Sequence, residues 1–338
     1  MKKSGRDLWE SYSPEMPKCL LELAQTNAMK RLKGISMHCG CNYTKFPVQK
    51  SKFYYSRFDH SVGTALLVWR FTEDLKQTIA ALFHDIATPV FSHVIDFVNG
   101  DYEKQESTEE YTRKFIEESQ EIMTILEKYD LTVDDIYDYH KYPIADNDSP
   151  KLSADRLEYT LGGMYAYGIA DLDTIVGMLS DLSISTNEDD EPEISFKSLS
   201  VAVEFFNKSL MCSKIYVADE TRLAMDYLAE LVNLALASNA IELDDLYKTE
   251  RIVIEKLLHN ENTAKCWKDF TNFKKLGKGR KVFITNVTAK KRYIMPLCNG
   301  VRIESNSVDI RKAKSEFLKL DFNKDLIIKC NNFLSEAM

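Results

Sequence analysis

The chain has 338 residues, of which 44% are hydrophobic and 28% are charged, and its formal net charge is -8. These values are typical of a globular protein with one large or two smaller domains, and they argue against nucleic-acid binding over the whole surface. No apolar run approaches the roughly 18 residues of a membrane span, and the first residues lack the apolar stretch of a secretory signal.

The seven cysteines are odd in number and mostly scattered, which favours reduced thiols in the cytoplasm over a disulfide framework. Cys39 and Cys41 follow His38 and so look like part of a metal cluster. No second Cys/His pair has zinc-finger spacing, however. We therefore expect a tight turn with small buried thiols at this point, and a cytoplasmic location for the protein.

Apolar residues recur at helical spacing over most of the chain, whereas two C-terminal segments are rich in β-forming residues. The spacing predicts helices over 17–34, 58–76, 77–87, 91–98, 106–129, 132–139, 152–163, 171–183, 196–238 with a break, 241–259 and 308–336. Gly162 and Gly163 are expected to close the helix that begins at 152. The β-rich segments 281–287 and 292–298 predict a small hairpin or sheet over about 281–305.

The predicted fold class is mainly α, with two parts along the chain. We expect a helical core with the functional site over 1–185. A helical extension should follow over 186–338, with the small β structure and a C-terminal helix.

The stretch 57–101 stands out because it is largely apolar and yet contains three of the six histidines, His60, His84 and His93. Burying a polar group without a partner costs roughly 2–7 kcal/mol, and a bound metal ion would supply a partner. Asp85 follows His84 directly, and adjacent helical residues diverge by about 100°. Both can reach one ion only if further ligands arrive from other elements.

Asp155, in the segment LSADRLEY, is the best candidate for a fourth ligand. Two imidazoles and two carboxylates with open positions suit an octahedral ion such as Mn, Fe or Mg, or less regularly Ni or Zn. We therefore expect one divalent metal ion, bound by His60, His84, Asp85 and Asp155.

In this order, the four residues resemble the H…HD…D signature of the HD-domain superfamily of metal-dependent phosphohydrolases. The branch that contains the deoxynucleoside triphosphate triphosphohydrolases, including the sterile-alpha-motif and HD-domain enzyme of animals, is the most similar. The matching segments are RFDHSVG (57–63), ALFHD (81–85), PVFSHVID (89–96) and ADRLEY (154–159).

The resemblance implies hydrolysis of a small phosphorylated substrate, such as a nucleotide, by water that the metal activates. It assigns phosphate contacts to Arg57 and Arg156, and a catalytic or supporting role to His93 and Asp96. Two residues are implied in substrate binding, Tyr159 near the sugar and, by a looser match, His38 near the nucleoside.

Ordinary structural roles are the alternatives for these residues. Arg57 and Arg156 could form salt bridges to Asp59, Glu158 or another acid, and Tyr159 could belong to the core. His93 could instead fix its own helix through a hydrogen bond.

The chain departs from the triphosphohydrolases at two positions. Thr88 stands where those enzymes have a histidine, and Thr108 stands where they have a catalytic histidine. A simpler phosphate ester is therefore also a candidate substrate. An HD protein with a ligand-binding or regulatory role and little turnover is the alternative function.

A cationic patch over Lys278–Arg292 contrasts with the acidic balance of the chain. A solvated loop is the default interpretation of this patch, and an anion site is the alternative. Sparse aromatic residues argue against nucleic-acid stacking, so nucleic acid is not an expected partner. Relatives often assemble, so a homodimer is one expectation.

Overall fold

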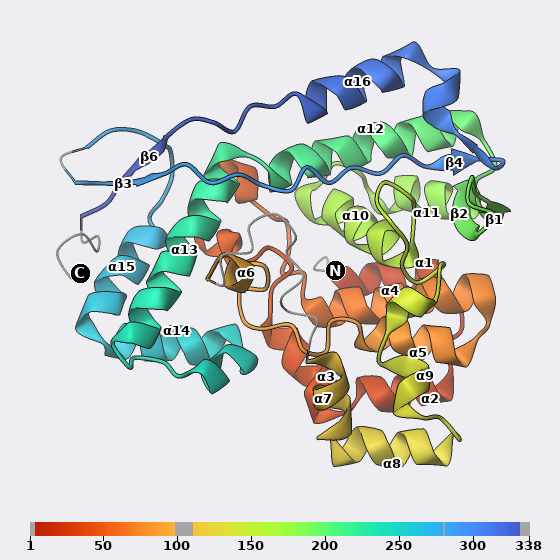
Figure 1. The fold of residues 1–338 in the computed structure, drawn as a ribbon, viewed down its shortest axis with the longest axis horizontal. Coiled ribbons are helices and arrows are strands. Elements are labelled where there is room, and N and C mark those ends of the chain that lie inside the picture. Colours follow the sequence, from red (N-terminus) through yellow and green to blue (C-terminus); the bar gives the residue numbers. More distant parts are fainter. Residues whose placement is uncertain (1–3, 99–110, 280, 332–338) are drawn as a thin grey trace.

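The computed structural model describes residues 4–98, 111–279 and 281–331, which form a mainly helical structure with two small sheets (Figure 1). The helices are α1 Trp9–Tyr12, α2 Lys18–Ala24, α3 Asn27–Arg31, α4 Arg57–Thr72, α5 Leu75–Phe83, α6 Val94–Val98, α7 Thr112–Glu117, α8 Gln120–Lys128, α9 Val133–Ile136, α10 Ala154–Tyr167, α11 Leu172–Ser180, α12 Leu199–Tyr216, α13 Asp219–Ala237, α14 Glu250–His259, α15 Glu261–Phe270 and α16 Val308–Leu318. The strands are β1 Leu182–Thr186, β2 Pro192–Phe196, β3 Val282–Thr285, β4 Leu297–Cys298, β5 Val301–Arg302 and β6 Leu326–Lys329. The mainly α fold class is thus confirmed.

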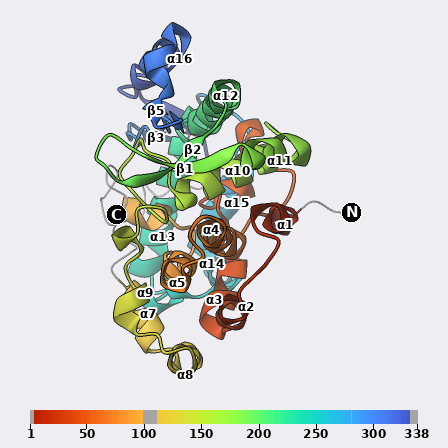
Figure 2. The same cartoon turned by 90° about the vertical axis from the view of Figure 1, so that its right-hand side faces the viewer.

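Helices α4 and α5 form a pair at the centre of the molecule, and local sequence signals fix where each begins. Ser56 caps α4 by accepting a hydrogen bond from the Asp59 amide, and the Asp59 carboxylate accepts the Ser56 amide in return. Asp74 caps α5 through the amides of Lys76 and Gln77. In the side view, α16 and α12 lie at one end and α2, α3 and α8 at the other, with α4 and α5 between them (Figure 2).

Helix α10 packs against α4, and it continues through the two glycines that the sequence predicts as its end. It ends instead at Gly168, whose φ of 73° suits a residue without a side chain. A Cβ atom at Gly162 would collide with the Tyr55 hydroxyl, and one at Gly163 would lie 2.5 Å from the Tyr216 hydroxyl. These glycines therefore allow close packing and do not terminate the helix.

Gly63 plays the same part on α4, which gives a direct test of this packing. A Cβ at Gly63 would lie 2.5 Å from Glu158 Oε1, in a buried contact between α4 and α10. We expect Gly63→Ala to lower the free energy of unfolding by about 1–3 kcal/mol, because the core cannot admit the extra methyl group. Gly177→Ala is the matched control, since open space surrounds Gly177 on α11 and alanine should stabilise that helix by about 0.5–1 kcal/mol. Equal stability of the two variants in chemical denaturation would contradict the expectation.

The small β structure predicted over about 281–305 is present as parts of two sheets, and the hairpin alternative is wrong. Segment 281–287 contains β3, but β3 pairs in antiparallel fashion with β6, near the C-terminus. Segment 292–298 contains β4, which pairs in parallel with β2 and in antiparallel fashion with β5. Strand propensity does not specify the partner, which here is set by packing between distant segments.

Several predicted helices also have other bounds in the structure. Within the described part of 308–336, which ends at residue 331, α16 is the helix and Leu326–Lys329 is a strand. Over 106–129, the described part divides into α7 and α8, with Ser119 capping α8 through the Ile122 amide. Over 171–183, α11 ends at Ser180, and β1 and β2 follow as a hairpin that the sequence does not predict.

Two hydrophobic clusters form the core. The first joins α1–α5 and α8 to α10, α12 and β2, so it contains residues on both sides of position 185. The second joins α6 to α13, α14, α15, β3 and β6. The division of the chain into domains at residue 185 stays a prediction.

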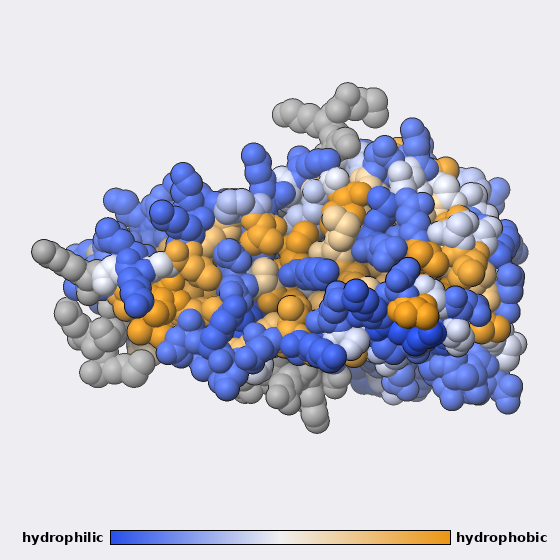
Figure 3. All heavy atoms as spheres, turned by 90° about the horizontal axis from the view of Figure 1, so that it is seen from above, coloured by the Kyte–Doolittle hydropathy of each residue, from blue (hydrophilic) through white to orange (hydrophobic). Residues whose placement is uncertain are grey.

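Among the described residues, no helix has the length and apolar content needed to cross a bilayer. Seen from above, hydrophobic side chains form separate patches between charged ones (Figure 3). The seven cysteines all lie in the described residues, and the structure places none of them in a disulfide.

Candidate metal centre and substrate cavity

The four predicted metal ligands come together at the junction of three helices. His60 lies in the first turn of α4, His84 and Asp85 follow the end of α5, and Asp155 lies in the first turn of α10. The Nε2 atoms of His60 and His84 lie 3.0 Å apart, and Asp155 Oδ1 lies 3.0 and 3.6 Å from them. Asp85 Oδ2 lies 3.7 and 3.6 Å from the same two nitrogens. Such separations are those expected between neighbouring ligands of one ion at about 2.0–2.2 Å from each.

The outer nitrogens of both imidazoles are held, so that their inner nitrogens face the centre. His84 Nδ1 lies 2.7 Å from the carbonyl oxygen of Ala81, which can only accept, so this nitrogen carries the proton. His60 Nδ1 lies 2.6 Å from Glu158 Oε2. Imidazoles oriented in this way by a carbonyl or a carboxylate are typical of metal ligands.

The four predicted ligands attract positive charge. We use this property to test whether a metal ion fits the site. Although burial lowers it, hydrogen bonds to Asp155 and Glu158 raise the pKa of His60 to about 10. Without a metal, a proton therefore stays among these groups, and a divalent ion would replace it. The residues fit one divalent metal ion held by two imidazoles and two carboxylates.

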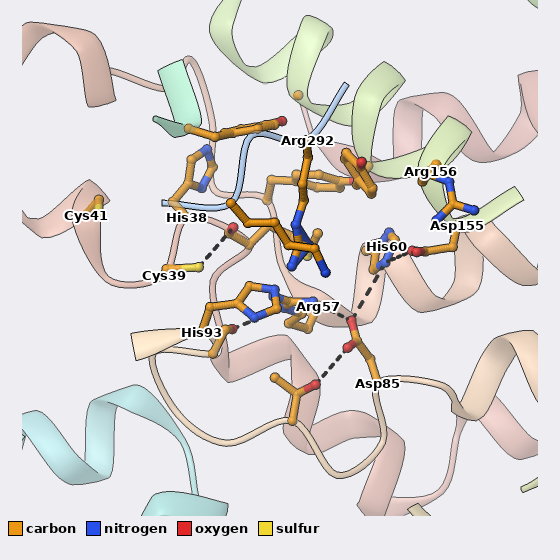
Figure 4. Close-up of a pocket in the computed structure, with 18 of the residues that line it drawn as sticks. His38, Cys39, Cys41, Arg57, His60, Asp85, His93, Asp155, Arg156 and Arg292 are labelled. Carbon is orange, nitrogen blue, oxygen red and sulfur yellow. Dashed lines mark hydrogen bonds and ion pairs between the residues drawn. The ribbon is translucent and has the colours of Figure 1, made fainter. Parts of the chain in front are cut away.

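Asp85 reaches the centre because α5 ends one residue before His84. Residues 84–87 form a turn, although His84 itself keeps helical φ and ψ angles of -53° and -35°. Arg57 Nη1 lies 2.8 Å from Asp85 Oδ2, and the Thr88 hydroxyl donates to Oδ1 at 2.7 Å (Figure 4). Burial opposes ionisation of Asp85, but Arg57 and the two histidines hold its pKa well below the ordinary value. Thr88 thus orients Asp85, a predicted ligand.

Glu158 is a part of the site that sequence reasoning treats only as a salt-bridge partner. Its side chain is fully buried and accepts hydrogen bonds from the hydroxyls of Tyr12 and Tyr55, in addition to its contact with His60. Glu158 lies three residues after Asp155, so both acids share one face of α10. The spacing relates the two acids to each other, but it does not show that their face of α10 is buried.

The His93–Asp96 pair lies beside the metal ligands. His93 Nδ1 lies 2.9 Å from the fully buried Asp96 Oδ2, and burial lowers the pKa of His93 despite this hydrogen bond. Phe91 and Ser92, just before, have positive φ angles of 59° and 50°. Such conformations cost about 1–3 kcal/mol each and persist only where packing enforces them.

Arg156 borders the cavity, but much of its hydrogen-bonding capacity is used locally. Its Nε donates to the Lys151 carbonyl at 2.7 Å, Nη1 lies 3.2 Å from Asp146 Oδ1, and Nη2 contacts Asn147. Its role toward phosphate stays a prediction. Thr108 lies outside the described residues.

A cavity of about 440 Å³ opens from the metal ligands, and α10 forms one of its walls. Asp155, Tyr159, Gly163 and Tyr167 line it at four-residue spacing, which at 1.5 Å per residue extends over about 18 Å. A phosphate group fills only a small part of this length, so the cavity has room for an organic group as well.

The end of the cavity around Tyr167 offers neutral, mainly aromatic groups. His38 contacts Tyr167 edge to face at 5.3 Å, and burial lowers the pKa of His38 to about 4, so that it is uncharged near neutral pH. Tyr216 lies 6.5 Å from Tyr159 between ring centres. Both predicted substrate-binding residues, His38 and Tyr159, therefore line the cavity.

Cys39 and Cys41 lie in the predicted turn beside His38, with Gly40 in a left-handed conformation. Within residues 4–98, 111–279 and 281–331, the candidate metal-binding cluster of three or more side chains is His60, His84 and Asp155. Cys39 and Cys41 are not members of this cluster.

Comparison with known proteins identifies the same segment. Residues 57–160 match the HD domain family. The chain is 29% identical over 250 residues to the uncharacterized protein YdhJ of Bacillus subtilis, covering 72% of each protein. It is 29% identical over 149 residues to the metal-dependent phosphohydrolase cns2 of Cordyceps militaris, covering 44% of this chain and 41% of cns2. It is 25% identical over 259 residues to the uncharacterized protein MJ1154 of Methanocaldococcus jannaschii, covering 70% of this chain and 51% of that protein.

The matched segment contains the four predicted metal ligands and the residues that orient them. Over residues 57–160, the chain is therefore similar to the HD domain family, and one relative that it resembles is a metal-dependent phosphohydrolase.

Proposed function

We propose that the protein hydrolyses a phosphate ester of a nucleotide or a related small molecule. The observation that carries this proposal is the continuity of one cavity, which joins four converging metal ligands to a neutral aromatic end about 18 Å away along α10. Ligand cavities of about 300–1,000 Å³ suit small organic molecules, and this cavity of about 440 Å³ falls in that range.

The residues around the metal ligands supply distinct steps. A bound divalent ion would polarise a phosphoryl oxygen and make hydroxide available near neutral pH. Arg57 and Arg156 stabilise the charge that develops on the phosphoryl oxygens. His93, oriented by Asp96, accepts or returns a proton at its Nε2 atom.

A nucleotide suits the neutral end of the cavity. His38, Tyr159 and Tyr167 present ring faces and edges to a planar group, while Gln49 and Ser213 offer uncharged hydrogen-bonding atoms. Thr88 stands in place of a histidine of the triphosphohydrolases, and its hydroxyl is engaged with Asp85. Both a triphosphate and a simpler phosphate monoester therefore stay candidate substrates. We place this activity in the cytoplasm and expect a homodimer, which light scattering would test.

A substrate panel tests the proposal. The full chain, loaded with Mn²⁺, is incubated with nucleoside mono-, di- and triphosphates and with p-nitrophenyl phosphate. We expect release of phosphate, pyrophosphate or triphosphate from at least one nucleotide, and loss of that release after chelation. If the loaded protein binds nucleotides in thermal-shift measurements but hydrolyses nothing in the panel, the ligand-binding or regulatory role replaces the enzymatic one.

The role of His93 gives a pH-dependent prediction. Since burial lowers the pKa of His93 below the ordinary value of a histidine, His93 is mainly neutral at pH 7 and loses its capacity as a base on acidification. The wild-type rate should therefore fall as pH falls through this pKa. We expect His93→Gln to lower the rate about 10²–10⁴-fold and to remove this acidic limb from the pH–rate profile. His259→Gln, an exposed histidine on α14, serves as the control. Retention of the limb in His93→Gln would exclude His93 as its origin.

A further inference from the structure

The segment between β3 and β4, residues 286–296, crosses the molecule as an extended strap (Figure 1). One end is fixed where Arg222 donates to the Val287 carbonyl. The other end is fixed at the buried Met295, whose amide donates to the Pro150 carbonyl at 2.9 Å and whose carbonyl accepts from Arg302 at 2.8 Å. The strap is thus held at both ends, and its middle residues have a fixed orientation.

The three cations of the strap point to different places. Lys290 and Arg292 line the cavity, whereas Lys291 donates to the carbonyls of Leu318 and Leu320, at the end of α16 and just after it. The Arg292 amide donates to the Lys290 carbonyl at 3.0 Å, so a γ-turn centred on Lys291 separates the two cavity-lining cations from Lys291. Figure 4 shows the Arg292 side chain in the middle of the cavity, between His38 and His60.

The strap changes the charge balance of the cavity. Five arginine and lysine side chains line it against three aspartates, although the protein has a net charge of -8. A divalent ion at the four ligands would add to this positive excess. Concentrated positive charge in a concave site attracts a ligand with several negative charges.

We propose that the strap is a phosphate clamp, in which Lys290 and Arg292 bind the phosphate chain of the substrate from a wall that the HD domain does not provide. Residues 57–160 supply the metal ligands and Arg57, and the strap lies 126 residues or more beyond them in the sequence. Arg292 enters the cavity and Lys290 lies exposed at its mouth, so that two cations meet phosphate oxygens at different depths. A guanidinium can bind two phosphate oxygens at once, which gives Arg292 the larger part.

The clamp also divides the cationic patch that the sequence shows over Lys278–Arg292. Lys278 is exposed and does not line the cavity, whereas Lys290 and Arg292 do. The cavity-lining part of the patch is therefore assigned to a small phosphorylated ligand.

Direct binding measurements test the clamp without turnover. Isothermal titration of the Mn²⁺-loaded full chain uses inorganic phosphate and pyrophosphate as probes. We expect Arg292→Gln to weaken pyrophosphate binding at least about tenfold, and Lys290→Gln to weaken it about three- to tenfold, because each removes a charge-assisted hydrogen bond. Lys278→Gln removes the same charge outside the cavity and should change the affinity less than about twofold. Arg292→Lys should recover part of the loss.

Metal content and thermal stability of each variant identify losses that come from unfolding. If Arg292→Gln is unstable, the pyrophosphate affinity of Lys290→Gln tests the clamp, because Lys290 is exposed. Unchanged pyrophosphate affinity in folded Arg292→Gln and Lys290→Gln overturns the clamp, and so does an equal loss in Lys278→Gln. The clamp rests on the proposed function only in taking this cavity as the substrate site. Absence of hydrolysis in the panel with intact clamp binding would reject the enzymatic proposal alone, and hydrolysis without clamp binding would reject the clamp alone.

Discussion

Asp85→Ala is expected to abolish metal binding and to lower any hydrolytic rate at least about a thousandfold, since the variant loses one of four ligands and the metal-activated water with it. Asp85 is the ligand whose two oxygens are both held, one by Arg57 and one by Thr88. Loss of the Asp85 side chain therefore removes both a negative charge and a carboxylate whose orientation is fixed. Metal analysis of the purified variant, together with rates on the best substrate of the panel, measures the effect.

The same substitution should also destabilise the protein, because Arg57 is buried and would lose its ion-pair partner. Breaking a buried pair in this way typically costs about 3–5 kcal/mol. Asp85→Asn separates the two effects, as its amide oxygen can still accept a hydrogen bond while the charge is absent. Asp173→Ala, at an exposed position of α11, is the matched control. Stoichiometric metal in both Asp85 variants would show that Asp85 is not a ligand.

The four candidate ligands could be selected from the sequence because the required chemistry restricts the choice of residues, and their binding of a metal stays a prediction. Few reasons exist for His60, His84 and Asp85 to occur in an apolar stretch, and Asp155 stands in a segment with the same character. Their convergence at 3.0–3.7 Å depends on three helix termini, of which Ser56 and Ser153 are recognisable caps. The sequence thus specifies both the donors and the starts of two of their helices.

Glu158, Lys290 and Arg292 show why the rest could not be predicted. The sequence does not distinguish a buried glutamate from an exposed one. Glu158 is buried only because α10 packs on α4. Lys290 and Arg292 occur in a basic run that predicts a solvated loop. Their place in the cavity is set by anchors at Pro150 and Arg222, both far away in the sequence.

The pairing of the β segments has the same origin. Val282–Thr285 and Leu297–Cys298 each have strand propensity, and the short distance between them in the sequence favours a local hairpin. Each pairs elsewhere, with Leu326–Lys329 and with Pro192–Phe196, because the strap between them is held extended across the cavity. A turn between the two segments would remove Arg292 from the site.

Glu158→Gln is expected to weaken metal binding about 10–100-fold while the fold persists. The carboxylate holds His60 Nδ1 at 2.6 Å and so fixes the ring whose Nε2 faces the other ligands. A neutral amide keeps the volume and one acceptor, but it draws the Nδ1 proton less strongly and makes His60 a weaker donor. Competition with a metal-sensitive dye gives the dissociation constant directly and does not depend on turnover.

Tyr12→Phe distinguishes this positioning role from a general effect of disturbing the network. It removes one hydrogen bond to the same carboxylate, of 3.2 Å, and leaves the contact with His60 in place. We expect its unfolding free energy to fall by about 0.5–1.5 kcal/mol and its metal affinity to change less than about threefold. If Tyr12→Phe and Glu158→Gln weaken metal binding equally, the network acts through stability alone. If only Glu158→Gln weakens metal binding, the charge on Glu158 orients His60 toward the metal. The metal centre then includes Glu158 as a fifth residue, in addition to the four predicted ligands.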